Sequence, residues 1–304
     1  MNVNLLRHVR TIVTHDNCPD GIASALILHA ALPDARIVFV QYGDARHREL
    51  PAEPGMLFCD MTPPAERVQE FVDVCAIVLD HHKRQEDIVG AFGVRGRFAD
   101  EKLHPGVSGA VLAFREVFLP MASGDLALGM REDAALHLAR LVGIRDTWRK
   151  DDPMFDRASA ISEALRFIPF DRLLAVDLCG MSAYLESLGN VLVERKQASA
   201  RDLAARAVRI QVGALGVAVI PSTTLTSDVS EMMLDADLVA GFAYVADEGG
   251  QRVRLSWSLR SRAGVDVSAI AAQHGGGGHA AAAGFSVHDD GRSPYVRASE
   301  LLRV

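Results

Sequence analysis

The first half of the chain alternates short apolar runs with longer stretches whose apolar residues recur every three or four positions. Four of the runs have the length and composition of buried strands, at residues 11–15, 36–42, 55–60 and 75–80. Residues 21–32 and 63–72 have the periodicity of amphipathic helices. Strands that alternate with helices predict a mainly parallel sheet with helices on both faces.

The second half begins as helix and ends as a different kind of sheet. Residues 108–121 and 131–148 predict helices, and the helical pattern over 156–208 ends in a long charged stretch that we interpret as a connecting helix. Apolar runs between residues 213 and 261 then alternate as strands. We therefore expect an α/β chain of two domains. We expect residues 1–190 to form the first domain, which holds the candidate chemistry described below, and residues 191–304 to comprise the connecting helix and a smaller mixed α/β domain.

Composition narrows the class of protein. At 304 residues the chain exceeds one ordinary core, and its 49% hydrophobic content is typical of a folded protein. A net charge of -7 argues against a surface that coats nucleic acid, so an anionic substrate would need local positive charge. The four cysteines have no CxxC spacing, which favours free thiols in a reducing compartment. Without a long apolar run or a signal-peptide pattern, we expect a cytoplasmic protein that does not contact membranes.

Acids and histidines stand where several predicted strands end. His15 ends the first strand, Asp60 ends the third, and Asp80, His81 and His82 end the fourth. Alone, the last triplet would fit an ordinary turn. Ligands, however, collect beyond the carboxyl ends of parallel strands, so three coinciding strand ends indicate a shared site.

Further acids lie where the same fold would bring them to that site. Asp16 and Asp20 follow the first strand, although Asp20 with Gly21 would also fit a turn before a helix. Asp146 lies near the end of the helix over 131–148. Carboxylates and imidazoles together suit Mn²⁺, Fe²⁺ or Zn²⁺. These residues predict a metal site.

A glycine run marks the C-terminal domain. Gly275 to Gly278 precede His279, and glycine amides in a loop can face an anion. A flexible linker is the alternative, although a linker rarely separates a helix from an alanine-rich apolar segment. Arg260 lies near a strand end, where a guanidinium can bind a phosphate through two nitrogens. Taken alone, Arg260 is equally typical of a surface arginine that binds no phosphate.

The ordered set of motifs resembles the DHH phosphoesterase superfamily over nearly the whole chain. The matching positions run from the His and Asp-Gly motif at 15–21 through Asp60, the triplet at 80–82, Ser-Gly-Ala at 108–110 and Asp146 to the glycine run. That family comprises Mn²⁺-dependent phosphoesterases, among them RecJ-type exonucleases, nanoRNases, cyclic-dinucleotide phosphodiesterases, and polyphosphate and pyrophosphate hydrolases.

The resemblance implies a role for each matching residue. Asp60 would bridge two metal ions, with Asp20, His81 and Asp146 completing the ligands of one ion and His15 on the other. Asp80 would support the site from behind, and His82 would lie close to the phosphate. The substrate's phosphates or nucleotide end would be held by Arg260, Gly276, Gly277, Gly278 and His279.

The first motif departs from the family pattern. The family usually has a His four residues before one Asp and six before another, whereas Asp20 here follows His15 by five. Either Cys18 occupies the first acid position, or Ile22 replaces the second acid. Asp16 is a further candidate ligand that would compensate, and a thiolate at Cys18 would favour softer Zn²⁺. We therefore expect one or two Mn²⁺ ions, with other divalent metals open.

The function expected is that of a metal-dependent phosphodiesterase or exonuclease-type hydrolase. Metal-activated water would cleave phosphodiester bonds of short single-stranded oligonucleotides or small dinucleotides. A chain without extra nucleic-acid modules is not expected to bind long duplexes. The alternatives are a polyphosphate or pyrophosphate hydrolase and an inactive nucleotide-binding protein, and a homodimer is left open.

Overall fold

The structure is a computed structural model that describes residues 1–42, 44–100, 102–122, 130–175, 178–246, 250, 252–262 and 264–303, with only the backbone at 178–182. The chain divides into two compact units, Met1–Val193 (unit 1) and Glu194–Val304 (unit 2). The division falls inside one long helix, α11 (Leu178–Ala205).

Unit 1 contains a five-stranded sheet in which every pairing is parallel. Its strands are β1 (Thr11–His15), β2 (Arg36–Val40), β3 (Met56–Cys59), β4 (Ile77–Asp80) and β5 (Gly96–Phe98), in the order β2-β1-β3-β4-β5. The predicted parallel sheet is thereby confirmed. Strand β5 was not predicted, because Gly-Arg-Phe is not an apolar run.

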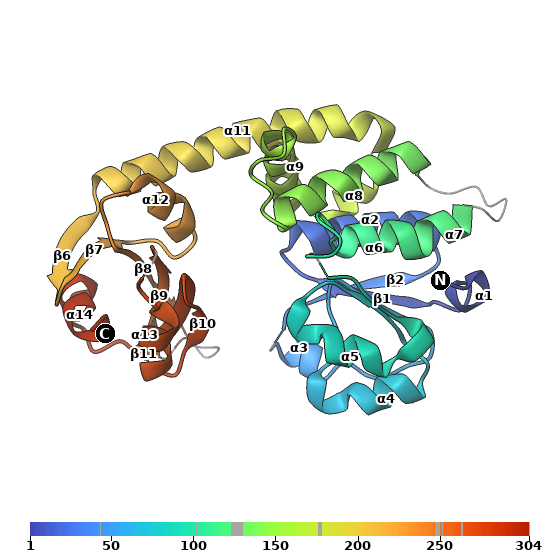
Figure 1. Ribbon diagram of the computed structural model, residues 1–304, viewed down its shortest axis with the longest axis horizontal. Coiled ribbons are helices and arrows are strands. Elements are labelled where there is room, and N and C mark those ends of the chain that lie inside the picture. The colour runs from blue at the N-terminus through green and yellow to red at the C-terminus, as the bar shows by residue number, and fades with distance from the viewer. Residues whose placement is uncertain are drawn as a thin grey trace. The chain divides into compact units, whose positions relative to one another are not determined.

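Both faces of this sheet are buried, since alternate residues of a strand enter different cores. In β1, Ile12 packs into the larger core and Val13 into a second one. Figure 1 shows the helices that cover the two faces. One face carries α2 (Pro19–Ala31), α6 (Gly109–Ala113) and α8 (Glu132–Asp146), and the other carries α3 (Ala45–Arg48), α4 (Val68–Asp73) and α5 (Glu86–Ala91).

The remaining helical segments of unit 1 are short or peripheral. Helix α9 (Phe155–Phe167) packs on α8, and the predicted helix over 108–121 is built from α6, the π-helical turn η4 (Phe114–Phe118) and α7 (Leu119–Ala122). The others are α1 (Val3–Leu6), α10 (Phe170–Leu174), η1 (Ala65–Arg67), η2 (Lys83–Gln85) and η3 (Gly93–Arg95).

Unit 2 is the predicted mixed α/β domain. Its six strands are β6 (Val208–Val212), β7 (Leu215–Ile220), β8 (Leu238–Ala246), β9 (Val253–Ser261), β10 (Gly277–His279) and β11 (Ala282–His288), in the order β10-β11-β9-β8-β7-β6. Only β7 and β8 pair in parallel among these described strands. The helices are α12 (Thr226–Met232), α13 (Val267–Gln273) and α14 (Pro294–Leu301).

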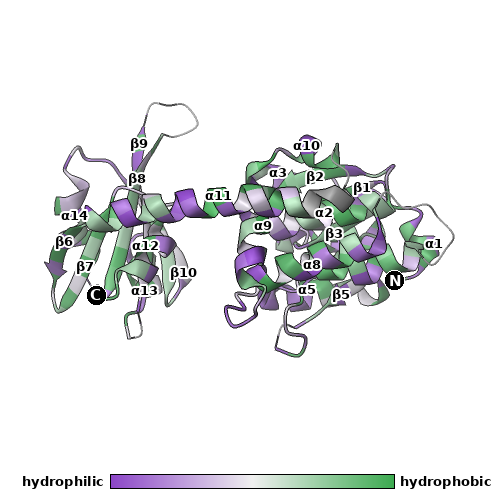
Figure 2. Ribbon diagram, turned by 90° about the horizontal axis from the view of Figure 1, so that it is seen from above, coloured by the Kyte–Doolittle hydropathy of each residue, from purple (hydrophilic) through white to green (hydrophobic). Residues whose placement is uncertain are grey.

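Hydropathy follows this division into strands and connecting helix. In Figure 2 the strands β2, β3 and β7 are largely green, whereas α11 carries several purple, hydrophilic turns. Within the described residues, no helix combines the length and the apolar character that a membrane crossing requires.

Candidate metal centre

Three neighbouring strands of unit 1 deliver polar side chains to one edge of the sheet. His15 is the last residue of β1, Asp60 directly follows β3, and Asp80 is the last residue of β4. The strand order β1-β3-β4 places these ends side by side, as expected for parallel strands.

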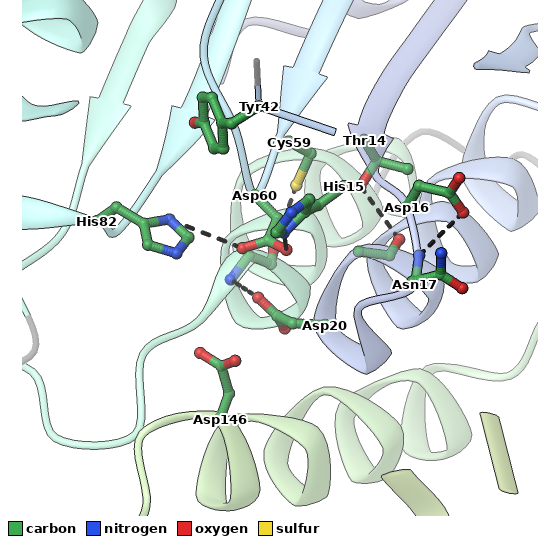
Figure 3. A network of polar contacts seen from close by, with 12 residues as sticks. Thr14, His15, Asp16, Asn17, Asp20, Tyr42, Cys59, Asp60, His82 and Asp146 are labelled. Atoms are coloured by element: carbon green, nitrogen blue, oxygen red, sulfur yellow. Dashed lines mark hydrogen bonds and ion pairs between the residues drawn. The ribbon is translucent and has the colours of Figure 1, made fainter. Parts of the chain in front are cut away.

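Asp60 lies at the centre of the site. Its side chain is 1% exposed, with Oδ2 3.9 Å from Nδ1 of His15 and Oδ1 3.3 Å from Nε2 of His81. The two carboxylate oxygens thus face different histidines. Figure 3 shows Asp60 beside His15, with His82 and Asp20 pointing toward it. Asp60 also has φ of 63°, a left-handed conformation that costs an L-residue roughly 1–2 kcal/mol.

The side of Asp60 that faces His15 has polar atoms without hydrogen-bond partners. Within the described residues, Asp60 Oδ2 and His15 Nδ1 are buried and accept or donate no hydrogen bond. His15 Nε2 lies 2.9 Å from Oε1 of Gln41, so Nε2 carries the proton and Nδ1 keeps its lone pair. Burial lowers the pKa of His15, which favours the neutral imidazole that a metal requires.

A second group of donor atoms surrounds His81. Its Nε2 lies 3.8 Å from Oδ2 of Asp20 and 3.5 Å from Oδ2 of Asp146. Asp146 is the last residue of α8 and, in Figure 3, points from that helix toward Asp20. Burial and the negative charge of Asp20 raise the pKa of Asp60 well above its usual range. A nearby cation would stabilise the charged form of a buried carboxyl that several other acids surround.

The Ser-Gly-Ala motif holds Asp20 in place. Its carboxylate accepts hydrogen bonds from Ser108 Oγ at 2.7 Å, Gly109 N at 2.6 Å and Ala110 N at 2.9 Å. A Cβ atom on Gly109 would lie 2.5 Å from Cβ of Asp60 and 2.8 Å from Oδ2 of Asp20. Glycine is therefore required for the start of α6 to reach both acids.

Asp80 organises the triplet turn. Its Oδ1 accepts hydrogen bonds from the backbone N of His81 at 2.7 Å and of His82 at 3.0 Å, and lies 2.7 Å from Nδ1 of His82. Burial alone would lower the pKa of His82, but the hydrogen bond and charge of Asp80 raise it above the ordinary value. Tyr42, which the sequence analysis missed, donates to Asp80 Oδ2 at 3.5 Å.

Gln41 and Tyr42 could have been found from their position alone. Both follow β2, whose carboxyl end meets the same sheet edge as β1. Neither residue type is a usual metal ligand, so the pattern of acids and histidines does not point to them.

Donor atoms within the described residues form three close groups, two of which include Asp60. One of these two also contains Asp80, His81 and His82. Atoms of His15, Cys18 and Asp60 lie within 4.8 Å of one another, and so do atoms of Asp20, His81 and Asp146. Oxygen, imidazole and unpartnered buried atoms fit divalent metal ions. Asp16 belongs to none of these groups: Oδ1 accepts from the backbone N of Asn17, and Oδ2 lies 3.4 Å from Arg46 Nη2.

In unit 2, strand register brings Arg260 and His279 to one face of the sheet. His279 pairs with Ala282, which pairs with Arg260, and residues opposite one another in antiparallel strands point to the same side. Between Arg260 and His279, the intervening strand β11 contributes only the methyl group of Ala282. Arg260 donates from Nε to Ser227 Oγ at 2.8 Å and from Nη1 to Leu259 O at 2.8 Å, and burial lowers its pKa.

The glycine run leads from a turn into a strand: Gly275 lies in the turn after α13, and Gly276 directly precedes the strand. Gly277 and Gly278 begin the edge strand β10. A Cβ atom on Gly276 would lie 2.2 Å from Gly284 O, and one on Gly278 would lie 2.5 Å from Ala282 O. These two glycines are required by backbone packing in the hairpin. At Gly277 a Cβ atom would meet nothing within 4 Å.

Comparison with known proteins agrees with this arrangement. The family model described as the DHHA1 domain matches residues 225–299, and no curated protein matches the chain. A pGpG-specific phosphodiesterase, PggH, from Vibrio cholerae is similar with a TM-score of 0.58 and 12% identity, over 96% of this chain and 97% of that one.

RecJ from Thermus thermophilus, solved in complex with Mn²⁺, is similar with a TM-score of 0.51 and 17% identity. That match covers 97% of this chain and 52% of RecJ, so the chain spans about half of RecJ. Similarity at these identities establishes a fold. The chain therefore has a fold similar to those of PggH and RecJ, and its residues 225–299 match the DHHA1 domain.

Proposed function

We propose that this protein is a metal-dependent phosphoesterase that hydrolyses phosphodiester bonds of short single-stranded oligonucleotides or small dinucleotides. The observation that carries the proposal is the carboxylate of Asp60, whose two oxygens face two different sets of metal-binding donors. A carboxylate shared in this way is the usual centre of a two-metal hydrolase.

The residues present fit one or two Mn²⁺ ions. Asp20, His81 and Asp146 would hold one ion together with Asp60, and His15 would contribute to the other. Bound ions would supply Lewis-acid chemistry, which polarises a phosphoryl oxygen and lowers the pKa of water. Asp16 stays a weaker candidate, because its carboxylate faces Arg46.

Asp80 and His82 act on the substrate side of the site. The Asp80 side chain is fully buried, whereas that of His82 is 43% exposed and so can meet a phosphate. Because Nδ1 of His82 faces Asp80, Nε2 is the atom left to contact a non-bridging oxygen. Asp80 would fix that orientation and stabilise the positive charge of the imidazole.

Unit 2 would bind the substrate's phosphates or nucleotide end. Arg260 and His279 lie on one face of its sheet, and Gly276, Gly277 and Gly278 form or adjoin the exposed edge of that sheet. Such a patch supplies the local positive charge that the net charge of -7 does not. The name of the Vibrio cholerae protein, pGpG-specific phosphodiesterase, and its similar length favour a small substrate.

Product analysis tests this proposal. Purified protein, with and without Mn²⁺, is incubated with pGpG, a single-stranded pentanucleotide, pyrophosphate and polyphosphate. We expect mononucleotides from the first two substrates, only with Mn²⁺. The variant His81→Ala serves as the control for contaminating nucleases and should be inactive. Phosphate release from the last two substrates alone would replace the proposal with a phosphoanhydride hydrolase. Binding of pGpG without any product would indicate an inactive nucleotide-binding protein.

A further inference from the structure

The start of α2 places a sulfur atom among the metal-binding donors. Cys18 is the N-cap residue of α2, and its side chain makes no capping hydrogen bond. Its Sγ lies within 4.8 Å of donor atoms of both His15 and Asp60. A serine, threonine or aspartate at this position would ordinarily cap the helix. The thiol makes no such capping hydrogen bond, although the backbone N–H groups of Gly21 and Asp20 lie close to it.

His15 and Asp60, the two residues near this sulfur, provide independent evidence for a bound cation. Asp60 Oδ2 and His15 Nδ1 are buried and, within the described residues, lack hydrogen-bond partners. The Asp60 side chain is 1% exposed, so water does not satisfy that oxygen from bulk solvent. Buried polar atoms normally have hydrogen-bond partners. Two such atoms without partners, beside a thiol, form a suitable set of ligands for a cation.

The nearby Cys59 shows what a structural thiol looks like in the same unit. Its side chain is fully buried at the end of β3, and Sγ donates a hydrogen bond to Gly109 O at 3.3 Å. Cys59 belongs to none of the donor groups found within the described residues. Cys18, by contrast, is partly exposed and is grouped with two donors. The two thiols differ in role.

We propose that Cys18 is a metal ligand, so that the centre has a sulfur-containing subsite of His15, Cys18 and Asp60 next to the oxygen-rich subsite of Asp20, His81 and Asp146. This inference rests on the proposed metal-dependent function and specifies its ligands. On binding, the metal–sulfur bond replaces the S–H bond, and the proton leaves to solvent. A thiolate is a soft ligand, so this subsite prefers Zn²⁺, Co²⁺ or Cd²⁺ to Mn²⁺.

Spectroscopy with Co²⁺ and Cd²⁺ tests the proposal without relying on turnover. Metal-free wild-type protein is titrated with Co²⁺ and separately with Cd²⁺, and a thiolate-to-metal charge-transfer band is followed in the near and far ultraviolet. We expect the band in the wild-type protein and in Cys75→Ser, which removes an exposed thiol outside the site. We expect its loss in Cys18→Ser and in Cys18→Asp.

The metal preference gives a second readout. Replacing sulfur with a carboxylate in Cys18→Asp should shift the ratio of Zn²⁺ to Mn²⁺ dissociation constants toward Mn²⁺ by about tenfold or more. Metal that binds to the wild-type protein without a charge-transfer band, or a band that persists in Cys18→Ser, overturns the ligand proposal and leaves the hydrolase proposal standing. A wild-type protein that binds no Co²⁺, Cd²⁺ or Mn²⁺ overturns both.

Discussion

The two units differ in where they keep their charged groups. In unit 1, Asp20, Asp60 and Asp80 are each at most 1% exposed, and most of their oxygens have defined partners. In unit 2, the residues from Gly275 to His279 are exposed along the edge of a sheet, and Arg260 is only partly buried. One unit has buried negative charge, and the other offers accessible positive charge and backbone.

This contrast suggests a division of labour. Buried carboxylates cannot move away from one another, so their repulsion favours either protonation or a nearby cation. An exposed sheet edge can adapt to phosphates of different spacing at little cost. Changes in unit 1 should therefore alter metal content and kcat, whereas changes in unit 2 should alter KM.

The largest effect is expected for Asp60→Asn. Asparagine keeps the size of the side chain and tolerates positive φ, so the fold should survive. Losing the shared carboxylate should reduce hydrolysis roughly 1,000-fold or more. We also expect Mn²⁺ to raise the Tm of the wild-type protein and to leave the Tm of this variant unchanged. Turnover, elemental analysis and thermal unfolding measure these effects.

The matched control is Asp16→Asn, which removes an acid from the same motif. Because Asp16 faces Arg46 and lies outside the donor sets, we expect less than about a threefold loss of activity. Equal losses in the two variants would mean that the first motif binds metal differently from the arrangement proposed.

Much of unit 1 could be predicted, because its polar residues interrupt strong apolar patterns. Parallel strands that are buried on both faces leave few places for His15, Asp60 or Asp80 except their ends. Spacing alone allows either Cys18 or Ile22 at the position where the first motif departs from the pattern, and only the structure shows that Cys18 lies near His15 and Asp60. Gln41 escaped notice because its role is to orient a histidine rather than to bind an ion.

Gly109→Ala should have the next largest effect. The new methyl group would lie 2.5 Å from Asp60 Cβ and push against Asp20, so both donor sets shift. Overpacking of this kind costs about 1–3 kcal/mol in the free energy of unfolding. We expect a lower Tm and weaker Mn²⁺ binding, measured by thermal unfolding and isothermal titration calorimetry.

Gly90→Ala provides the comparison within unit 1. Gly90 lies in α5, where a Cβ atom would meet nothing within 4 Å, so alanine should leave metal binding unchanged and stabilise by up to about 1 kcal/mol. If Gly109→Ala also kept the wild-type affinity for Mn²⁺, the start of α6 would not be part of the metal centre.

Unit 2 was harder to predict, for a physical reason. Strand β10 contains two glycines, and glycine has no side chain that would reveal alternation. The pairing that brings Arg260 and His279 to one face depends on the register of three strands, and no single segment encodes it. The central strands were predictable, because β7 and β8 are apolar runs and β9 alternates apolar with polar residues.

Arg260→Ala tests the role of that face. A charge-assisted hydrogen bond to phosphate is worth about 1.5–3 kcal/mol, so KM for pGpG should rise roughly tenfold or more, with kcat changed much less. Arg254→Ala is the control, because Arg254 lies on the same face of β9, and its Nη2 donates to Ser286 O at 3.2 Å. Steady-state kinetics distinguishes the two. A fall in kcat with unchanged KM would place Arg260 in the chemical step instead.

The smallest effect, and the sharpest comparison within unit 2, concerns two adjacent glycines. Gly276→Ala would bring Cβ to 2.2 Å from Gly284 O, so the hairpin itself should be destabilised and Tm should fall. Gly277→Ala has open space and should leave Tm unchanged or slightly raised. If the edge of β10 lies against the substrate, the added methyl group at Gly277 should still raise KM by a few-fold.

A KM effect without a stability effect can arise only from the bound state, because the free protein accommodates the methyl group. Thermal unfolding and pGpG kinetics on both variants therefore separate packing from recognition. Wild-type KM in Gly277→Ala would mean that the glycine run serves the hairpin alone. Substrate binding in unit 2 would then depend on side chains, with Arg260 and His279 as its main contributors.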